Sequence, residues 1–119
     1  MNETQQLVNA ITEGIQDKKG KNIVVADLTN IGDTICQYFI ICQGNSPSQV
    51  QAIAESIGES ARLKAHAKPV AVDVLRNAEW VAMDYTDIIV HVFLPQTRDF
   101  YDIEHLWADA QLTSLPDID

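Results

Sequence analysis

Apolar side chains recur at two different spacings along the chain, and each spacing predicts its own kind of element. Residues 3–18 place an apolar side chain every three or four positions, which is typical of an amphipathic helix. A second helical pattern follows Ser46 and Pro47, residue types that favour the cap and the first turn of a helix. A third covers residues 98–108, and its apolar residues are expected to face a sheet.

Short, mostly apolar runs predict the strands. They cover residues 23–28, 36–42 and 70–75, and the second run is apolar on both faces, as in a central strand. The most hydrophobic stretch, residues 80–93, predicts two strands joined by a tight turn. Residues 88–93 are almost all β-branched or aromatic, which predicts a strand buried on both of its faces.

The order helix, two strands, helix, three strands, helix predicts an α/β fold. We expect a single domain over residues 1–110, built on a mixed five-stranded sheet with packed helices. Residues 111–119 contain a proline and two aspartates, and they are expected to form a loose acidic tail. So small a sheet should leave part of one face, or one edge, uncovered for a partner.

Charge narrows the range of partners. The chain has 119 residues, of which 46% are hydrophobic, and 17 acidic against 8 basic side chains give a net charge of −9. Such a surface repels phosphate backbones, so direct sequence-specific binding to nucleic acid is not expected. The same charge suits a basic protein partner, although it could equally serve only to keep the protein in solution.

The cysteines and the N-terminal residues favour a cytoplasmic protein. Cys36 and Cys42 fall in one predicted strand, where they would stand roughly 20 Å apart, too far for a disulfide. Neither has histidines at metal-binding spacing. No apolar run is long enough to cross a bilayer, and residues 1–6 lack the features of a signal peptide. We therefore expect no membrane association.

An enzymatic site is weakly supported. Gly44-Asn45-Ser46 resembles the Gly-Ser element of nucleotidyltransferases, which also require paired carboxylates to hold two metal ions. The following strand has Asp73, with an apolar residue where the second carboxylate should be. A helix cap explains Ser46 without any ligand, so neither an enzyme nor a cofactor is expected.

Other reactive side chains have structural explanations as well. His91 could pair with a cysteine as a nucleophile, but histidine and cysteine on apolar strands are more often core residues. We expect a buried His91 that donates to a carboxylate or to the backbone. Asp84 and Asp87 flank the predicted turn, where aspartate commonly accepts from nearby backbone N–H groups.

Binding to another protein is better supported by the aromatic residues. Tryptophan, tyrosine and arginine dominate the energetics of protein interfaces, and they occur in the hairpin and in the last predicted helix. Strand alternation places Trp80, Ala82 and Asp84 on one side of the hairpin, and Met83 and Tyr85 on the other. A tryptophan beside an aspartate favours a surface over a deep core.

Four motifs, in order, resemble the ribosomal silencing factor family, also called Iojap-like proteins. They are IVVADL at 23–28, YFIICQGNS at 38–46, WVAMDYTDIIVHVF at 80–93 and RDFYDIEHLW at 98–107. The resemblance implies a fold related to nucleotidyltransferases but without their catalytic carboxylates. It also implies a protein that binds large-subunit ribosomal protein fourteen, blocks joining of the ribosomal subunits and represses translation when nutrients are scarce.

Family members in organelles act in large-subunit assembly, so an assembly role remains the alternative function, and a metal-dependent nucleotidyl transferase is the less favoured one. A homodimer of the free protein is also expected to be feasible through the same aromatic residues. Carried onto this chain, the resemblance marks seven residues for contact with the partner: Trp80, Met83, Asp84, Tyr85, Arg98, Tyr101 and Trp107.

Overall fold

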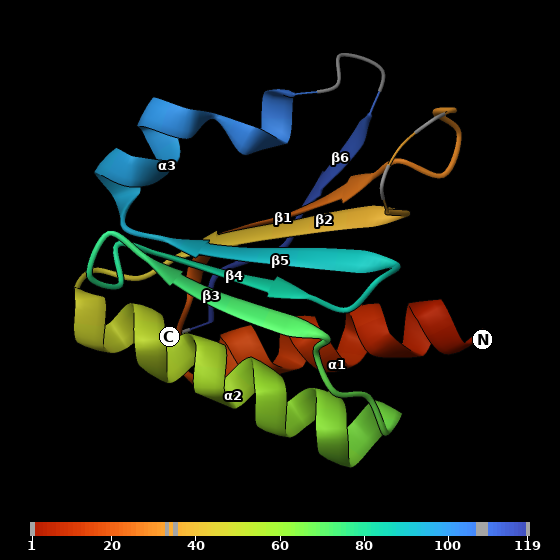
Figure 1. Ribbon diagram of the computed structural model, residues 1–119, viewed down its shortest axis with the longest axis horizontal. Coiled ribbons are helices and arrows are strands. Elements are labelled where there is room, and N and C mark those ends of the chain that lie inside the picture. The colour runs from red at the N-terminus through yellow and green to blue at the C-terminus, as the bar shows by residue number, and fades with distance from the viewer. Residues whose placement is uncertain (1, 33, 35, 107–109, 119) are drawn as a thin grey trace.

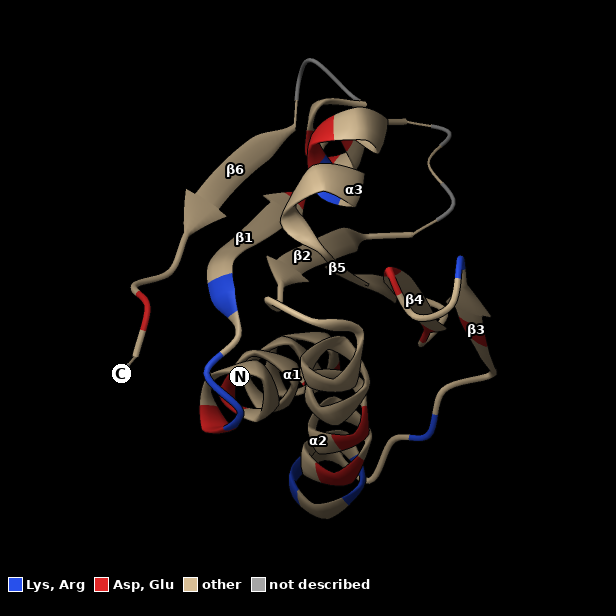
Figure 2. Ribbon diagram, turned by 90° about the vertical axis from the view of Figure 1, so that its left-hand side faces the viewer, with Lys and Arg blue, Asp and Glu red and all other residues tan. Residues whose placement is uncertain are grey.

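A computed structural model describes residues 2–32, 34, 36–106 and 110–118 of the chain. A sheet forms one layer, α1 and α2 pack beneath it, and α3 lies over the opposite face (Figures 1 and 2). In chain order the elements are α1 (Glu3–Asp17), β1 (Lys21–Asp27), β2 (Tyr38–Gln43), α2 (Pro47–Ala65), β3 (Ala71–Leu75), β4 (Trp80–Asp84), β5 (Ile88–Phe93), α3 (Pro95–Tyr101), the 3-10 turn η1 (Ile103–His105) and β6 (Gln111–Ser114). No helix among these described residues is long and apolar enough to cross a membrane.

The sheet is mixed, as the order of the elements predicts. Its strand order is β3-β4-β5-β2-β1-β6, with β2 and β5 parallel and every other neighbouring pair antiparallel. The parallel pair occupies the middle, where Ile40 lies opposite Val90, and both residues are fully buried. The long connection between β2 and β5 contains α2, β3 and β4, so a helix covers the central strands.

The sheet has six strands, and the prediction of five was wrong. The sixth, β6, pairs antiparallel with β1, although residues 111–119 were expected to form a loose tail. The backbone N–H of Leu115 donates to the carbonyl of Ile23 at 2.9 Å, and the Asp117 carboxylate accepts from the N–H of Asn22 at 2.9 Å. Backbone pairing therefore holds this segment, whose strand residues are all exposed and show no apolar pattern.

The last helix also differs from its prediction over residues 98–108. α3 begins earlier, at Pro95, and ends where Asp102 adopts a left-handed conformation (φ 48°) and donates its N–H to the Arg98 carbonyl at 2.8 Å. After this break the chain no longer keeps the spacing of one continuous helix, although Ile103 still packs, partly buried, against the core. Leu106 is 60% exposed, and Phe100, on the last turn of α3, is 80% exposed.

Two small-residue contacts bring α1 and α2 close together beneath the sheet. The Ser60 hydroxyl donates to the Ala10 carbonyl at 2.6 Å, and the Ser56 hydroxyl donates to the Gly14 carbonyl at 2.7 Å. At the start of α2, the Ser46 hydroxyl accepts from the N–H of Gln49 at 3.1 Å, which confirms the predicted cap. The two helices thus form one unit that covers a single face of the sheet.

Candidate functional site

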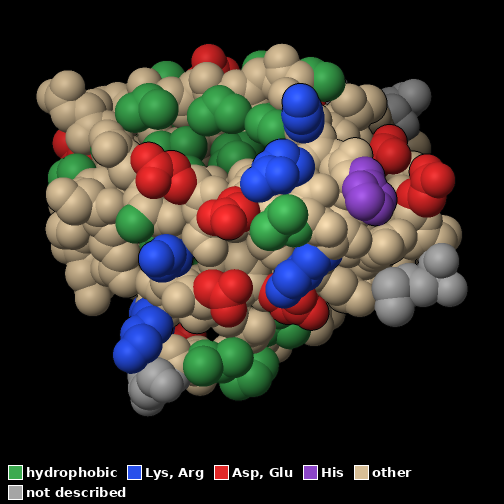
Figure 3. All heavy atoms as spheres, turned by 90° about the horizontal axis from the view of Figure 1, so that it is seen from below, with side chains coloured by type: hydrophobic (Ala, Val, Ile, Leu, Met, Phe, Trp, Pro, Cys, Tyr) green, Lys and Arg blue, Asp and Glu red, His purple; other side chains and the backbone are tan. Residues whose placement is uncertain are grey.

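A cavity lies on the helix side of the sheet, between α2 and the β3–β4 edge. It has a volume of about 450 Å³ and is lined by Gln51, Ala54, Glu55, Gly58, Pro69, Val72, Val74, Val81 and Met83. Figure 3 shows the helix layer, where hydrophobic side chains gather at the upper edge and acidic and basic side chains mix over the rest. Because Glu55 is the single ionisable residue of this lining, the cavity offers little acid–base chemistry.

The opposite face of the sheet carries an aromatic cluster centred on Trp80. Its ring lies 4.8 Å from that of Tyr101, 5.0 Å from that of Phe93 and 5.8 Å from that of His91, measured between centroids. Trp80 and Tyr101 are half-buried, whereas Phe93 is fully buried beneath them. The cluster therefore rises from the core of the sheet to its surface.

A hydrogen bond joins the tryptophan to the buried histidine. The Trp80 indole Nε1–H donates to His91 Nδ1 at 3.1 Å. His91 is 6% exposed and packs edge-on against Phe39 at 5.2 Å. Burial lowers the pKa of His91 to about 4, so the ring is neutral near pH 7.

The prediction that His91 is a core residue is thus confirmed, and the prediction of its partner was wrong. The histidine accepts from an indole, where donation to a carboxylate or to the backbone was expected. No local sequence pattern indicates this pair, because Trp80 and His91 come together only through the register of β4 against β5.

The exposed part of the cluster continues onto α3 and the β3–β4 turn. Phe100 packs edge-on against Tyr101 at 5.0 Å, and Arg76 Nη1 donates to the Tyr101 hydroxyl at 3.2 Å. We call Trp80, Phe100 and Tyr101 the aromatic surface. Beside it lies a pocket of about 180 Å³, lined by Arg76, Glu79, Gln96, Thr97, Phe100 and Tyr101. Phe100 was among the apolar residues of the last predicted helix that were expected to face the sheet, and its 80% exposure corrects that expectation.

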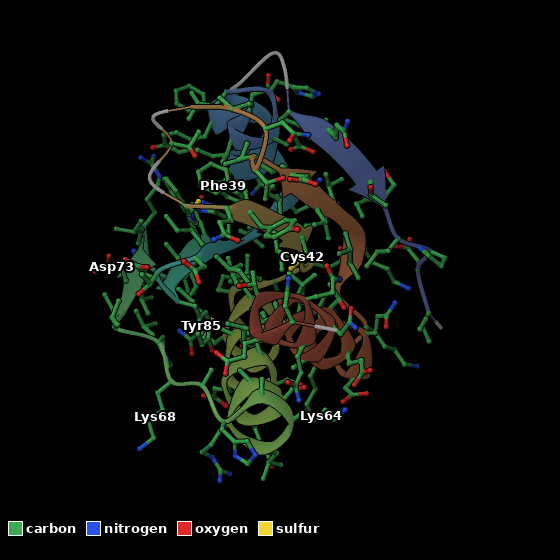
Figure 4. All side chains as sticks on the ribbon, turned by 90° about the vertical axis from the view of Figure 1, so that its right-hand side faces the viewer. Phe39, Cys42, Lys64, Lys68, Asp73 and Tyr85 are labelled. Carbon is green, nitrogen blue, oxygen red and sulfur yellow. The ribbon has the colours of Figure 1, made fainter. Side chains whose placement is uncertain are left out.

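Met83 and Tyr85 lie on the other side of the hairpin, in the interior. Met83 is 3% exposed and Tyr85 is 7% exposed, and both pack in the core between the sheet and the helices. Figure 4 shows Tyr85 on the helix side of the sheet, away from Phe39. Burial raises the pKa of the Tyr85 hydroxyl to about 12. Both side chains are buried in this conformation, and their contact with a partner stays a prediction.

Arg98 is buried too, and it joins the last helical segment to the sheet. Its guanidinium makes a bidentate pair with the Glu104 carboxylate at 2.9 and 2.7 Å. Nη1 also donates to the Asn22 carbonyl at 2.6 Å and to the Gln43 side chain at 3.2 Å. Arg98 is 7% exposed, so it lies in the interior of this structure, and its contact with a partner stays a prediction.

Asp84 and Trp107 complete the set of marked residues. The Asp84 carboxylate accepts from the N–H of Thr86 at 2.7 Å, as expected for an aspartate beside a turn. It lies at the opposite end of β4 from Trp80. Trp107 falls outside the described residues. Of the marked residues, the structure therefore brings Trp80 and Tyr101 together at the surface.

The residues considered for catalysis lie in surroundings that do not activate them. Burial raises the pKa of the Cys36 thiol to about 11 and that of Cys42 to about 12, so neither is activated as a nucleophile. Asp73 is exposed on the edge strand β3, as Figure 4 shows. Within the described ranges, no three His, Cys, Asp or Glu side chains form a group that could hold a metal ion.

Comparison with known proteins places the chain in a family. The family model "Ribosomal silencing factor during starvation" matches residues 1–119. The chain is 35% identical over 116 residues to the ribosomal silencing factor RsfS of Halalkalibacterium halodurans, and this alignment covers 93% of each protein. It is 38% identical over 99 residues to RsfS of Bacillus subtilis, covering 83% of this chain and 82% of the relative.

A solved structure and an organelle relative extend the comparison. A crystal structure of a protein from Chromobacterium violaceum superposes with a TM-score of 0.82 at 33% identity, covering 98% of this chain and 94% of the other. The mouse "Mitochondrial assembly of ribosomal large subunit protein 1" is 29% identical over 84 residues, which cover 66% of this chain and 37% of the relative. Because the family model matches residues 1–119, this chain belongs to the ribosomal silencing factor (RsfS) family.

Proposed function

We propose that this protein binds the large ribosomal subunit through ribosomal protein fourteen, prevents the small subunit from joining and so represses translation under nutrient limitation. The observation that carries the proposal is membership of the RsfS family over residues 1–119. The aromatic surface supplies a site of suitable chemistry on the face of the sheet that α1 and α2 leave uncovered (Figure 2).

Burial and exposure in this surface suit a docking role. Phe100 is 80% exposed and Trp80 is half-buried against Tyr101, so a partner could cover large aromatic side chains that are already held in place. Aromatic residues with such rigid support are frequent energetic centres of interfaces. Two exposed acidic side chains belong to the same segment as Phe100 and Tyr101: Asp99 lies on α3, and Asp102 follows it directly.

Electrostatics favour a basic protein as the partner. The net charge of −9 attracts a basic ribosomal protein and is repelled by ribosomal RNA, so the protein contact must provide the affinity. Repression would then be steric, because the bound domain occupies space that the small subunit needs. Neither catalysis nor a cofactor is part of this mechanism, and the site of action would be the cytoplasm.

Cosedimentation with purified large subunits tests the proposal. We expect the protein to pellet with the subunits at micromolar concentration and Trp80→Ala to weaken binding about thirtyfold, the loss typical of an interface hot spot. Leu63→Ala is the matched control, because Leu63 is 57% exposed on α2, on the other side of the molecule. Circular dichroism must show that both variants fold. Wild-type protein that stays in the supernatant would contradict the proposal.

An assembly role is the second candidate, favoured by the likeness to the mouse protein whose name refers to assembly of the mitochondrial large subunit. The same contact would serve both functions, and they differ in the particle that is bound. Sucrose-gradient profiles of depleted cells separate them. Silencing predicts mature large subunits and excess subunit joining in starved cells, whereas assembly predicts an accumulation of large-subunit precursors.

We also propose that the free protein forms a homodimer through the aromatic surface. The exposed ring of Phe100 and the half-buried ring of Trp80 present apolar area that a second copy could cover. Sedimentation equilibrium should then detect a dimer that Phe100→Ala weakens and that dissociates on addition of ribosomal protein fourteen. A monomer at every concentration would remove this proposal without affecting the first.

A further inference from the structure

His91 uses one ring nitrogen and leaves the other without a partner inside the protein. Nδ1 accepts from the Trp80 indole at 3.1 Å. Since an accepting Nδ1 carries no proton, the neutral ring must carry its proton on Nε2. That second nitrogen is buried and has no hydrogen-bond partner among the described residues.

Packing alone does not account for a histidine at this position. The ring lies edge-on to Phe39 and stacks with Phe93 at 5.9 Å, surroundings that an apolar side chain would fill without any unpaired polar atom. A buried donor without an acceptor costs free energy, and replacing it with a group of similar shape can be neutral or stabilising. The histidine therefore contributes something other than stability.

Its one hydrogen bond acts on the residue that carries the aromatic surface. Trp80 is half-buried at the end of β4, and its ring meets Tyr101 at 4.8 Å with an angle of 43° between the planes. Without the bond to His91, the indole N–H would need another acceptor, and the ring would be free to turn about its side-chain torsions.

We propose that His91 is the positioning residue of the docking surface: it fixes the orientation of the Trp80 indole so that the aromatic surface is preformed before the partner arrives. The effect on affinity rests on the proposed function, whereas the orientation of the Trp80 indole rests on the geometry of the free protein. A preformed surface binds more tightly because less side-chain freedom is lost on association.

Two variants separate the hydrogen bond from the volume of the ring. His91→Asn places an acceptor near the position of Nδ1, whereas His91→Leu fills the site without one. In the free protein, nuclear magnetic resonance reports the indole N–H of Trp80, which Trp80→Phe distinguishes from that of the second tryptophan. We expect this proton to exchange with solvent at least tenfold faster in His91→Leu than in wild type, and to stay protected in His91→Asn.

Binding to purified large subunits and thermal unfolding complete the test. His91→Leu should unfold at the wild-type temperature or above and yet bind about five- to tenfold more weakly, and His91→Asn should recover most of the affinity. Equal affinity of His91→Leu and wild type would overturn the proposal, as would an equal loss in both variants.

The wild-type protein provides a measurement that needs no variant to fold. Nitrogen chemical shifts of the His91 ring should identify the tautomer with its proton on Nε2, and a proton on Nδ1 would overturn the proposal. If wild type fails to bind large subunits, the proposed function falls. In that case the tautomer and the protection of the indole proton still decide whether His91 positions Trp80.

Discussion

The side chains of Trp80 and Arg98 differ in exposure and in the residues they contact. Trp80 remains half-buried at the surface beside Tyr101. Arg98 is 7% exposed and pairs with Glu104, six residues further along the chain. Residue type alone favours an interface for both, because arginine and tryptophan are enriched in interface hot spots. Only the position of Glu104 and the Asn22 carbonyl turns the guanidinium inward.

Replacing Arg98 should therefore destabilise the fold. Arg98→Ala leaves the Glu104 carboxylate buried without its partner, since their side chains are 8% and 13% exposed, and we expect a loss of about 3–5 kcal/mol. Chemical denaturation measures this loss, and binding to large subunits should fall only in proportion to the unfolded fraction. A variant that unfolds like wild type but no longer binds would place Arg98 in the interface instead.

His91 should make the protein sensitive to acid. Its pKa in the fold is about 4, below the ordinary value of 6.5, so the unfolded chain binds this proton more readily between those two pH values. Above pH 6.5 this histidine does not change the free energy of unfolding with pH. Below pH 6.5 that free energy falls, by about 2 kcal/mol at pH 5. As the pH falls below 6.5, the unfolding free energy of wild type should therefore drop relative to that of His91→Leu, and the gap between them should widen in favour of the variant. Parallel pH profiles would contradict this.

At the scale of elements, the contact between α1 and α2 depends on a glycine. A Cβ atom at Gly14 would lie 2.9 Å from the Ser56 carbonyl oxygen and 3.0 Å from the Ile57 Cα. Both neighbours are backbone atoms of α2, which cannot move aside without shifting the helix. The close approach in turn allows the hydrogen bonds from the α2 serines to the α1 carbonyls.

Alanine at the two helical glycines should have opposite effects. Gly14→Ala is expected to cost about 1–3 kcal/mol, because the added methyl group forces the helices apart. Gly58→Ala is the matched control: its Cβ would meet only the Met83 Cε, at 3.9 Å, so the variant should gain up to about 1 kcal/mol from helix propensity. Thermal unfolding of both variants measures these changes in stability. Similar changes in unfolding temperature for Gly14→Ala and Gly58→Ala would show that the packing of α1 against α2 does not depend on Gly14.

Elements with a strong internal pattern could be predicted, and those held by distant partners could not. The hairpin of β4 and β5, the Ser46 cap and the mixed sheet follow from local periodicity and turn chemistry. β6 forms because its backbone pairs with β1, more than eighty residues earlier in the chain, a pairing that leaves no hydrophobic pattern in 111–114. α3 ends at Asp102 through a left-handed cap that is usually glycine, so its end also went unpredicted.

In the whole molecule, α1 and α2 cover one face of the sheet and α3 lies over the other (Figure 1). The aromatic surface is on the face of α3. Phe100 is the most exposed large apolar side chain of the described residues, at 80%. An exposed aromatic ring supported by a second ring, as Tyr101 supports Phe100, is typical of a binding surface more than of a core.

Phe100→Ala should separate binding from stability. Because the side chain contacts little of the core, the free energy of unfolding should change by less than about 0.5 kcal/mol. Affinity for large subunits should fall about tenfold or more if the ring is covered by the partner. Unchanged affinity would remove Phe100 from the docking surface and leave Trp80 and Tyr101 as its remaining members.

Local sequence patterns were enough to predict the α/β class, the buried central strands and the two sets of residues that alternate along the hairpin. They could not decide which set meets the helices, because alternation shows which residues share a face and is silent on what covers that face. Only the packing of α1 and α2 buried Met83 and Tyr85, and only the register of β4 with β5 brought the Trp80 indole to His91. The aromatic surface is thus a product of tertiary structure, since its members come from β4 and α3 and meet only after the sheet has formed.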